Sequence, residues 1–167
     1  INGEGKMNVY KEKGKVSNLE TIASQRDTSG HIGIGHTRWA THGEPSAVNA
    51  HPHVSQNGRL ALVHNGIIEN YTSLKEFLTK KGYTFKSCTD TEVLVQLIEF
   101  MQDEYGKDLE GAVVMALRRV IGAYAIAVID HNCPDKIVVA KKSSPLVIGI
   151  GDNNSEFFIA SDALPIV

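Results

Sequence analysis

Apolar residues in the middle of the chain recur at helical spacing. Three such patterns begin near Asn70, Thr89 and Leu109. The second opens with Thr89 and Glu92 at the positions of a capping box, in which the two side chains satisfy backbone N–H groups of the first helical turn. A shorter helix, opened by the same kind of box, is predicted over residues 17–23.

Short apolar runs bounded by Pro, Asn and Gly predict strands on both sides of these helices. Residues 30–35 alternate small and apolar side chains and are expected to form the central strand, with glycines where another backbone or a ligand comes close. A hairpin turn at 56–59 precedes a buried strand at 60–63. The remaining predicted strands are residues 7–10, 123–129, 136–140, 146–150 and 157–160. This order of elements is typical of a layered α+β domain whose last strands form an antiparallel meander.

Composition narrows the class of protein. With 167 residues, of which 42% are hydrophobic, the chain is expected to be one domain with a sizeable core. Its net charge of -2, with both signs interspersed, favours neither nucleic acid nor a membrane surface as a partner. Cys88 and Cys133 are far apart and lack metal spacing, which favours a reducing compartment, and we expect a cytoplasmic protein.

The first candidate site is the polar cluster at residues 35–46. Arg38 offers a planar fork of donors that suits a carboxylate or phosphate, and Thr41 and His42 add hydrogen-bonding groups beside the indole of Trp39. The cluster therefore predicts a site for a small anion. The alternative is that Arg38 pairs with a surface carboxylate and Trp39 fills the core.

Asn65 and Gly66 form a second candidate site, directly after the apolar run at 60–63. The Asn65 amide and the Gly66 backbone N–H are suitable donors for an oxyanion hole, whereas Asn-Gly is also a favoured pair in a type I′ turn. Asp90 has two interpretations as well. A carboxylate in the first turn of a helix is favoured by the helix dipole, and it can also bind the ammonium group of a ligand.

Histidines supply a rival hypothesis, a metal-dependent hydrolase. His51 and His53 alternate as two ligands on one face of a strand do, but Pro52 between them favours a rigid extended segment with local hydrogen bonds. We therefore expect neither a metal nor another cofactor. The full set of histidines that this rival would use is His36, His42, His51, His53 and His64.

Several motifs together match a known family. They are residues 35–43, 49–53, 64–70, 89–92, 144–149 and 160–162. Their residues, order and spacing resemble those of the glutaminase domain of the glucosamine-6-phosphate synthase family. The members of this family are class II glutamine amidotransferases. The resemblance covers nearly the whole chain. It implies a four-layer αββα sandwich of the N-terminal-nucleophile hydrolase type, here a domain fragment over residues 1–167 that is incomplete at both ends.

The resemblance also implies a role for each candidate residue. Asn65 and Gly66 would form the oxyanion hole. Arg38 would hold the α-carboxylate of glutamine, and Asp90 its α-ammonium group. The remaining residues implied for the pocket are Thr41 and His42, with Trp39 where ammonia leaves.

The implied reaction is hydrolysis of L-glutamine to glutamate, with ammonia passed to fructose 6-phosphate to make glucosamine 6-phosphate. The family's nucleophile is an N-terminal cysteine whose α-amine is the base, and this chain begins at Ile1, so we expect the fragment alone to be inactive. The implied partners are the sugar-isomerase domains of a longer chain and further copies in a homo-oligomer. The alternatives that remain are a non-catalytic amino-acid-binding module and the histidine-based metal hydrolase.

Overall fold

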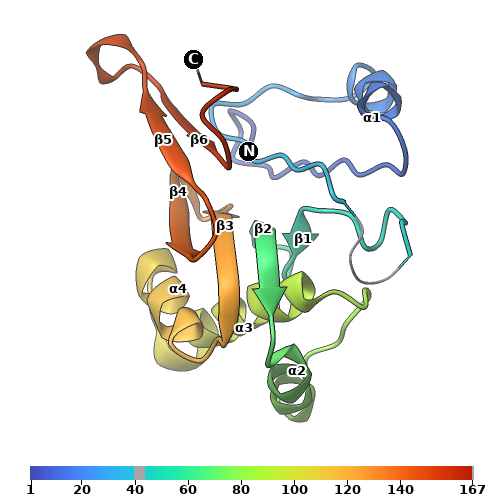
Figure 1. The fold of residues 1–167 in the computed structure, drawn as a ribbon, viewed down its shortest axis with the longest axis vertical. Helices are drawn as coiled ribbons and strands as arrows, with labels where there is room; N and C mark the ends of the chain where they lie inside the picture. Colours follow the sequence, from blue (N-terminus) through green and yellow to red (C-terminus); the bar gives the residue numbers. More distant parts are fainter. Residues whose placement is uncertain (40–43, 167) are drawn as a thin grey trace.

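The structure is a computed structural model that describes residues 1–39 and 44–166. Its elements are α1 (Val16–Ala23), β1 (His53–Val54), β2 (Leu60–Ile68), α2 (Tyr71–Lys80), α3 (Asp90–Tyr105), α4 (Leu109–Leu117), β3 (Gly122–Asp130), β4 (Cys133–Lys142), β5 (Val147–Ile150), the 3-10 helix η1 (Asp152–Asn154) and β6 (Phe157–Ala160). Figure 1 shows α3 and α4 behind the larger sheet, and the β5–β6 hairpin extending away from it.

Two antiparallel sheets form the described fold. The larger has the strand order β1-β2-β3-β4, and the smaller consists of β5 and β6. In the larger sheet Leu62 of β2 lies opposite both His53 of β1 and Val128 of β3. The predicted hairpin before β2 is confirmed, and β2 continues to Ile68 rather than ending at residue 63. The predicted later strands are present, but they do not form one meander, because β3 and β4 belong to the larger sheet and β5 pairs with β6 in the smaller one.

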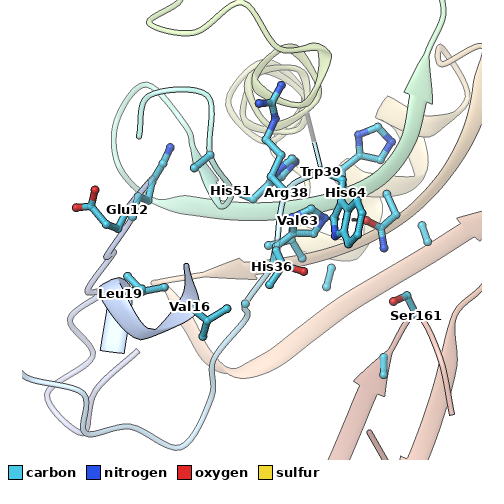
Figure 2. Close-up of a pocket in the computed structure, with 18 of the residues that line it drawn as sticks. Glu12, Val16, Leu19, His36, Arg38, Trp39, His51, Val63, His64 and Ser161 are labelled. Atoms are coloured by element: carbon cyan, nitrogen blue, oxygen red, sulfur yellow. Dashed lines mark hydrogen bonds between the residues drawn. The ribbon is translucent and has the colours of Figure 1, made fainter. Parts of the chain in front are cut away.

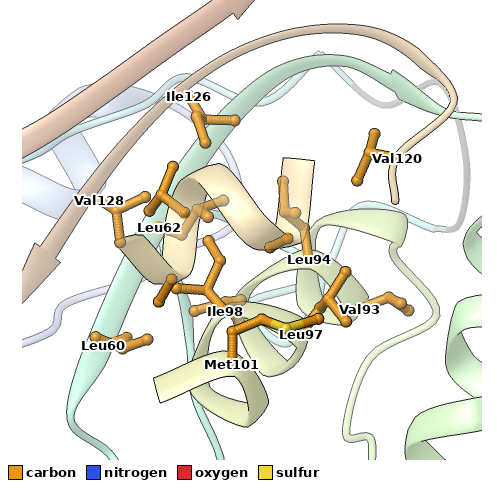
Figure 3. Packing of buried hydrophobic residues seen from close by; sticks show 14 of the residues in the cluster. Leu60, Leu62, Val93, Leu94, Leu97, Ile98, Met101, Val120, Ile126 and Val128 are labelled. Atoms are coloured by element: carbon orange, nitrogen blue, oxygen red, sulfur yellow. The ribbon is translucent and has the colours of Figure 1, made fainter. Parts of the chain in front are cut away.

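The core lies between the larger sheet and its helices. Leu97, Ile98 and Met101 of α3 are fully buried and pack with Leu62 and Val128 from the sheet (Figure 3). Burying each such side chain contributes about 1.5–3 kcal/mol. Because α3 contacts β1, β2, α2 and α4, it fixes the position of the strand that carries Asn65.

Helix α3 begins as the sequence predicts. The Thr89 hydroxyl accepts a hydrogen bond from Glu92 N at 3.2 Å. The Glu92 carboxylate does not return to Thr89 but accepts from the backbone N–H groups of Lys86, at 2.8 Å, and Ser87, at 2.6 Å. The box is therefore half formed, and its second half anchors the preceding loop.

Three predictions near the start of the chain are wrong. The first helix begins at Val16, and its N-cap is Lys15, which makes no side-chain bond, so the expected box of Ser17 and Glu20 does not form. Residues 7–10 and 30–35 form no strand. The extended segment at 30–35 lies against the first residues of the chain instead, where Ile1 N donates to Ile32 O at 2.9 Å, without a ladder of backbone bonds.

Of the glycines in that segment, Gly30 allows the close backbone approach that the sequence predicts, whereas Gly33 and Gly35 have no atom within 4 Å of a Cβ position. A Cβ atom on Gly30 would lie 2.4 Å from the carbonyl oxygen of Ile1, closer than real contacts allow. Overall, the α+β class is confirmed. Within residues 1–39 and 44–166, no helix is long and apolar enough to cross a lipid bilayer.

Candidate active site

The site is built on the open edge of β2. Strand β1 pairs only with Ala61 and Leu62, so the rest of that edge has no strand partner among the described residues. At one end of β2 the Leu60 carbonyl accepts from Ser55 N on the β1 side, and at the other end Ile68 N donates to Asp90 Oδ2 at 2.8 Å. Backbone groups of alternate residues point to the same edge of a strand. The Gly66 N–H therefore points to the open edge, on the side where Asp90 lies.

Asn65 lies inside β2 and not in a turn. It is opposite Ala125 of β3, so the type I′ turn is excluded. Its neighbour His64 is buried toward α3, and side chains alternate along a strand, so the Asn65 amide lies on the opposite face of the sheet. There the Asn65 Oδ1 lies 2.7 Å from His36 Nε2.

Gly66 is required by packing. Its φ of 129° lies in the region that favours glycine, and a Cβ atom there would lie 2.1 Å from the Ala123 carbonyl oxygen. Gly122 meets the same restriction from the other strand, with a Cβ position 2.1 Å from the Ile67 carbonyl oxygen. The two glycines allow β2 and β3 to approach closely beside the open edge.

Asp90, Arg38 and the Asn65-Gly66 pair line one cavity of about 220 Å³, together with Trp39. Asp90 is oriented by its bond to Ile68 N. Trp39 is 89% exposed, so it does not fill the core. Figure 2 shows Arg38 and Trp39 beside β2 with the neighbouring histidines. The cavity is thus lined by a cation, a carboxylate and amide donors, which together suit a small zwitterion that carries a polarisable carbonyl group.

Two predicted pocket residues, Thr41 and His42, lie outside the described residues. The other five fall in this one cavity. It shares lining residues, among them His36 and Asn65, with a wider cavity of about 1150 Å³, whose lining also includes Val16 and Leu19 of α1 (Figure 2). Lys11 also lines that wider cavity, and its half-buried position lowers the pKa of its ammonium group. The sequence carried no signal for this part of the cavity, because residues 10–16 have no motif of their own.

Four of the histidines named in the metal hypothesis do come together, but they bind hydroxyl and amide groups. His51 Nε2 and His64 Nδ1 each lie 3.1 Å from the Thr91 hydroxyl. His53 Nε2 lies 3.0 Å from the Thr89 hydroxyl. Among residues 1–39 and 44–166, no group of three or more His, Cys, Asp or Glu side chains is placed to hold a metal ion. His42, the fifth histidine, lies outside the described residues.

Three of these histidines, His51, His53 and His64, are neutral because burial disfavours the charged imidazole. Burial lowers the pKa of His51 to about 2, with the neighbouring His36 adding to the effect. Burial followed by the charge of Lys11 lowers the pKa of His53 to about 3. The pKa of His64 is lowered as well, again chiefly by burial. Thr91 was missed by the sequence analysis, where it is visible only as the residue that follows Asp90.

Comparison with solved structures defines the class of fold. Glutamine phosphoribosylpyrophosphate amidotransferase from B. subtilis superposes with a TM-score of 0.63 and 32% identity, over 77% of this chain and 27% of that chain. A structure described as the allosteric regulatory enzyme of purine biosynthesis gives a TM-score of 0.64 and 34% identity, over 77% of this chain and 27% of that one. The fold is therefore the αββα sandwich of amidotransferases of the N-terminal-nucleophile hydrolase type, as the resemblance implies.

Sequence comparison gives the family. The profile of the family described as glutamine amidotransferase domain matches residues 23–166. The chain belongs to this family. A relative from Bacteroides thetaiotaomicron, named glutamine–fructose-6-phosphate aminotransferase (isomerizing), is 63% identical over 100% of this chain and 27% of its own length. One of the same name from Chlorobaculum tepidum is 57% identical over 98% of this chain and 27% of its own length. The chain thus spans about a quarter of these relatives.

Proposed function

We propose that this chain is the glutaminase part of an enzyme that hydrolyses L-glutamine to glutamate and passes the ammonia to fructose 6-phosphate, which yields glucosamine 6-phosphate. The names of the relatives support the overall reaction. The observation that carries the glutaminase half is the single cavity in which Arg38, Asp90 and the Asn65-Gly66 pair meet. Glutamine has one group for each of them: an α-carboxylate, an α-ammonium group and a side-chain amide.

Arg38 and Asp90 bind the two charged groups of the substrate in this proposal. The Asp90 Oδ2 already accepts from Ile68 N, which fixes the plane of the carboxylate. Its Oδ1 lies 3.4 Å from the Thr91 hydroxyl, a long contact that leaves this oxygen able to accept from a substrate ammonium group. Arg38 provides the planar guanidinium that recognises a carboxylate through two parallel bonds.

Asn65 and Gly66 stabilise the transition state. A thiolate attacks the amide carbon of glutamine, a C–S bond forms, and the carbonyl oxygen takes the negative charge. The Asn65 side-chain N–H and the Gly66 backbone N–H donate to that oxygen. Collapse of the intermediate breaks the C–N bond, and ammonia leaves with the proton that the α-amine of the cysteine took from the thiol. Water then hydrolyses the thioester, which releases glutamate and regenerates the thiol. Following the resemblance, we assign the thiol to a cysteine upstream of Ile1. Cys88 does not line the cavity.

The remaining assignments follow the same proposal. Thr41 and His42 complete the glutamine pocket, and the exposed Trp39 lies where ammonia leaves. Residues 1–167 form a glutaminase domain fragment, inactive alone, within a chain that continues into sugar-isomerase domains and assembles as a homo-oligomer. We place the protein in the cytoplasm, away from nucleic acid and membranes, which the two free cysteines and the weak net charge support.

The test uses the full-length protein that contains this chain. Incubation with L-glutamine and fructose 6-phosphate is expected to release glutamate and glucosamine 6-phosphate in equal amounts. A metal chelator should not lower the rate at which either product forms. Binding of glutamine without release of glutamate would identify a binding module instead. Glutamate release without any glucosamine 6-phosphate would retain the glutaminase and overturn the assigned acceptor.

A further inference from the structure

We propose that His36 is a positioning residue that aims the Asn65 amide into the cavity. The inference deepens the proposed function and rests on it. His36 Nε2 lies 2.7 Å from Asn65 Oδ1. A carbonyl oxygen can only accept a hydrogen bond, so the imidazole Nε2 carries the hydrogen and donates it. This single bond decides which end of the Asn65 amide faces the protein.

The consequence for Asn65 is that its nitrogen faces the other way. A planar amide whose oxygen is held on one side presents its NH₂ group on the opposite side. Among residues 1–39 and 44–166 the Asn65 Nδ2 has no hydrogen-bond acceptor, although this side chain lines the cavity. Without the His36 bond, the amide is free to rotate and to present its oxygen to a developing negative charge. That orientation would repel the charge that Asn65 is proposed to stabilise.

His36 is itself held in place from α3. Its ring packs on the His51 ring with centroids 4.2 Å apart, and His51 Nε2 lies 3.1 Å from the Thr91 hydroxyl in the first turn of α3. Figure 2 shows His36, His51 and His64 gathered beside β2. The low pKa of His51 keeps its ring uncharged, so it packs on His36 without repulsion. Helix α3 thus holds His36 through His51, and His36 in turn holds the Asn65 amide.

The role predicts a loss of rate that depends on Asn65. In the full-length protein, His36→Phe keeps a ring of similar shape but removes the donor. We expect it to lower the glutaminase kcat by about 10- to 100-fold, less than the whole effect of an oxyanion donor, while the KM for glutamine stays within about threefold. His36→Gln keeps an N–H donor and is expected to recover kcat to within about tenfold of wild type. His31→Phe, in the same segment but exposed, is the matched control and should have no effect.

A double-mutant cycle separates positioning from a general structural role. If His36 acts through Asn65, then His36→Phe should cost less than about threefold in a protein that already carries Asn65→Ala. If His36→Phe lowers kcat by the same factor in the Asn65→Ala protein as in the wild type, the inference is overturned. A His36→Phe variant with wild-type kcat would overturn it as well. Should His36→Phe fail to bind L-glutamate, the His36→Gln variant decides: a loss as large as that of Asn65→Ala would overturn the inference. A wild-type protein that releases no glutamate would overturn the proposed function itself.

Discussion

At the scale of single residues, Asn65 has a position that the sequence alone leaves ambiguous. It is not in a turn but within β2, on the face opposite α3, with its oxygen engaged by His36. Its neighbour Gly66 is fixed by the Ala123 carbonyl oxygen, which leaves no room for a side chain. Gly66 therefore allows the close packing of β2 on β3, while the Asn65 side chain lines the cavity.

Replacing Asn65 by Ala tests the oxyanion role. The change removes one donor from the developing oxyanion, and we expect the glutaminase kcat of the full-length protein to fall by about two to three orders of magnitude. Substrate binding is expected to change little, because the oxyanion exists only after attack. Steady-state kinetics on glutamine measure both constants. Asn18→Ala, at an exposed position outside the two cavities, is the control, and an Asn65→Ala variant within about threefold of wild type would refute the assignment.

Replacing Arg38 by Lys tests the substrate grip. Lysine keeps the positive charge but loses the planar fork that binds both carboxylate oxygens. We expect the KM for glutamine to rise by about 10-fold or more, the cost of about one charge-assisted hydrogen bond, with a smaller change in kcat. An unchanged KM would argue against the carboxylate role.

At the scale of elements, α3 links the core to the site. Its apolar face packs on the sheet, and its first turn carries Asp90, which binds β2, and Thr91, which binds two histidines. The Thr89 hydroxyl both caps the helix, by accepting from Glu92 N, and lies 3.0 Å from His53 Nε2. The start of this helix therefore determines the geometry of the cavity.

Thr89→Ala should destabilise the chain more than an ordinary cap deletion. Losing the cap costs about 1 kcal/mol, and leaving the buried His53 nitrogen without its partner adds about 1–3 kcal/mol. Asp108→Ala, which removes the exposed cap of α4, is the matched control and should cost only about 1 kcal/mol. Urea unfolding followed by circular dichroism measures both. Equal losses for the two variants would show that the His53 contact adds nothing.

Elements with a strong local pattern could be predicted from the sequence, and elements that depend on a distant partner could not. The starts of α3 and α4 and the later strands follow from spacing, caps and turn residues within a few positions of one another. Residues 30–35 have a strand pattern, but what lies beside them is Ile1, which offers one backbone bond rather than a ladder. The role of Thr91 is likewise invisible locally, because its partners His51 and His64 are 40 and 27 residues away.

At the scale of the whole molecule, the cavity is assembled from segments that are distant in sequence. Residues 36–39 contribute Arg38, the edge of β2 contributes Asn65, and the start of α3 contributes Asp90. Individually each motif has a plausible structural explanation, and only their meeting in one cavity makes glutamine the favoured ligand. The same assembly buries His53 and His64 and partly buries His51, and the lowered pKa values of these three histidines predict that folding depends on pH.

Stability is expected to fall as the pH is lowered from 7 to 5. In the folded chain burial lowers the pKa of His51 to about 2 and that of His53 to about 3. In the unfolded chain both return to about 6.5. Between these values the unfolded state binds protons that the folded state does not. Each histidine therefore removes up to about 1.4 kcal/mol of stability for each pH unit below 6.5. His64, whose pKa is also lowered, acts in the same direction.

Glu99 is expected to act in the opposite direction and to increase stability as the pH falls. Variants of Glu99 and of the histidines should therefore change the pH dependence with opposite signs. Burial raises the pKa of its carboxyl group. The folded state therefore holds that proton at pH values where the unfolded carboxyl has lost it, and stability from this group increases as the pH falls. Urea unfolding of the chain at pH 7, 6 and 5 should show a net loss toward pH 5. The loss of unfolding free energy per pH unit should be larger in Glu99→Gln and smaller in a His51→Asn, His53→Asn double variant. It should stay unchanged in His31→Gln, which alters an exposed histidine. An equal slope in the double variant and the wild type would show that these buried imidazoles do not carry the pH dependence.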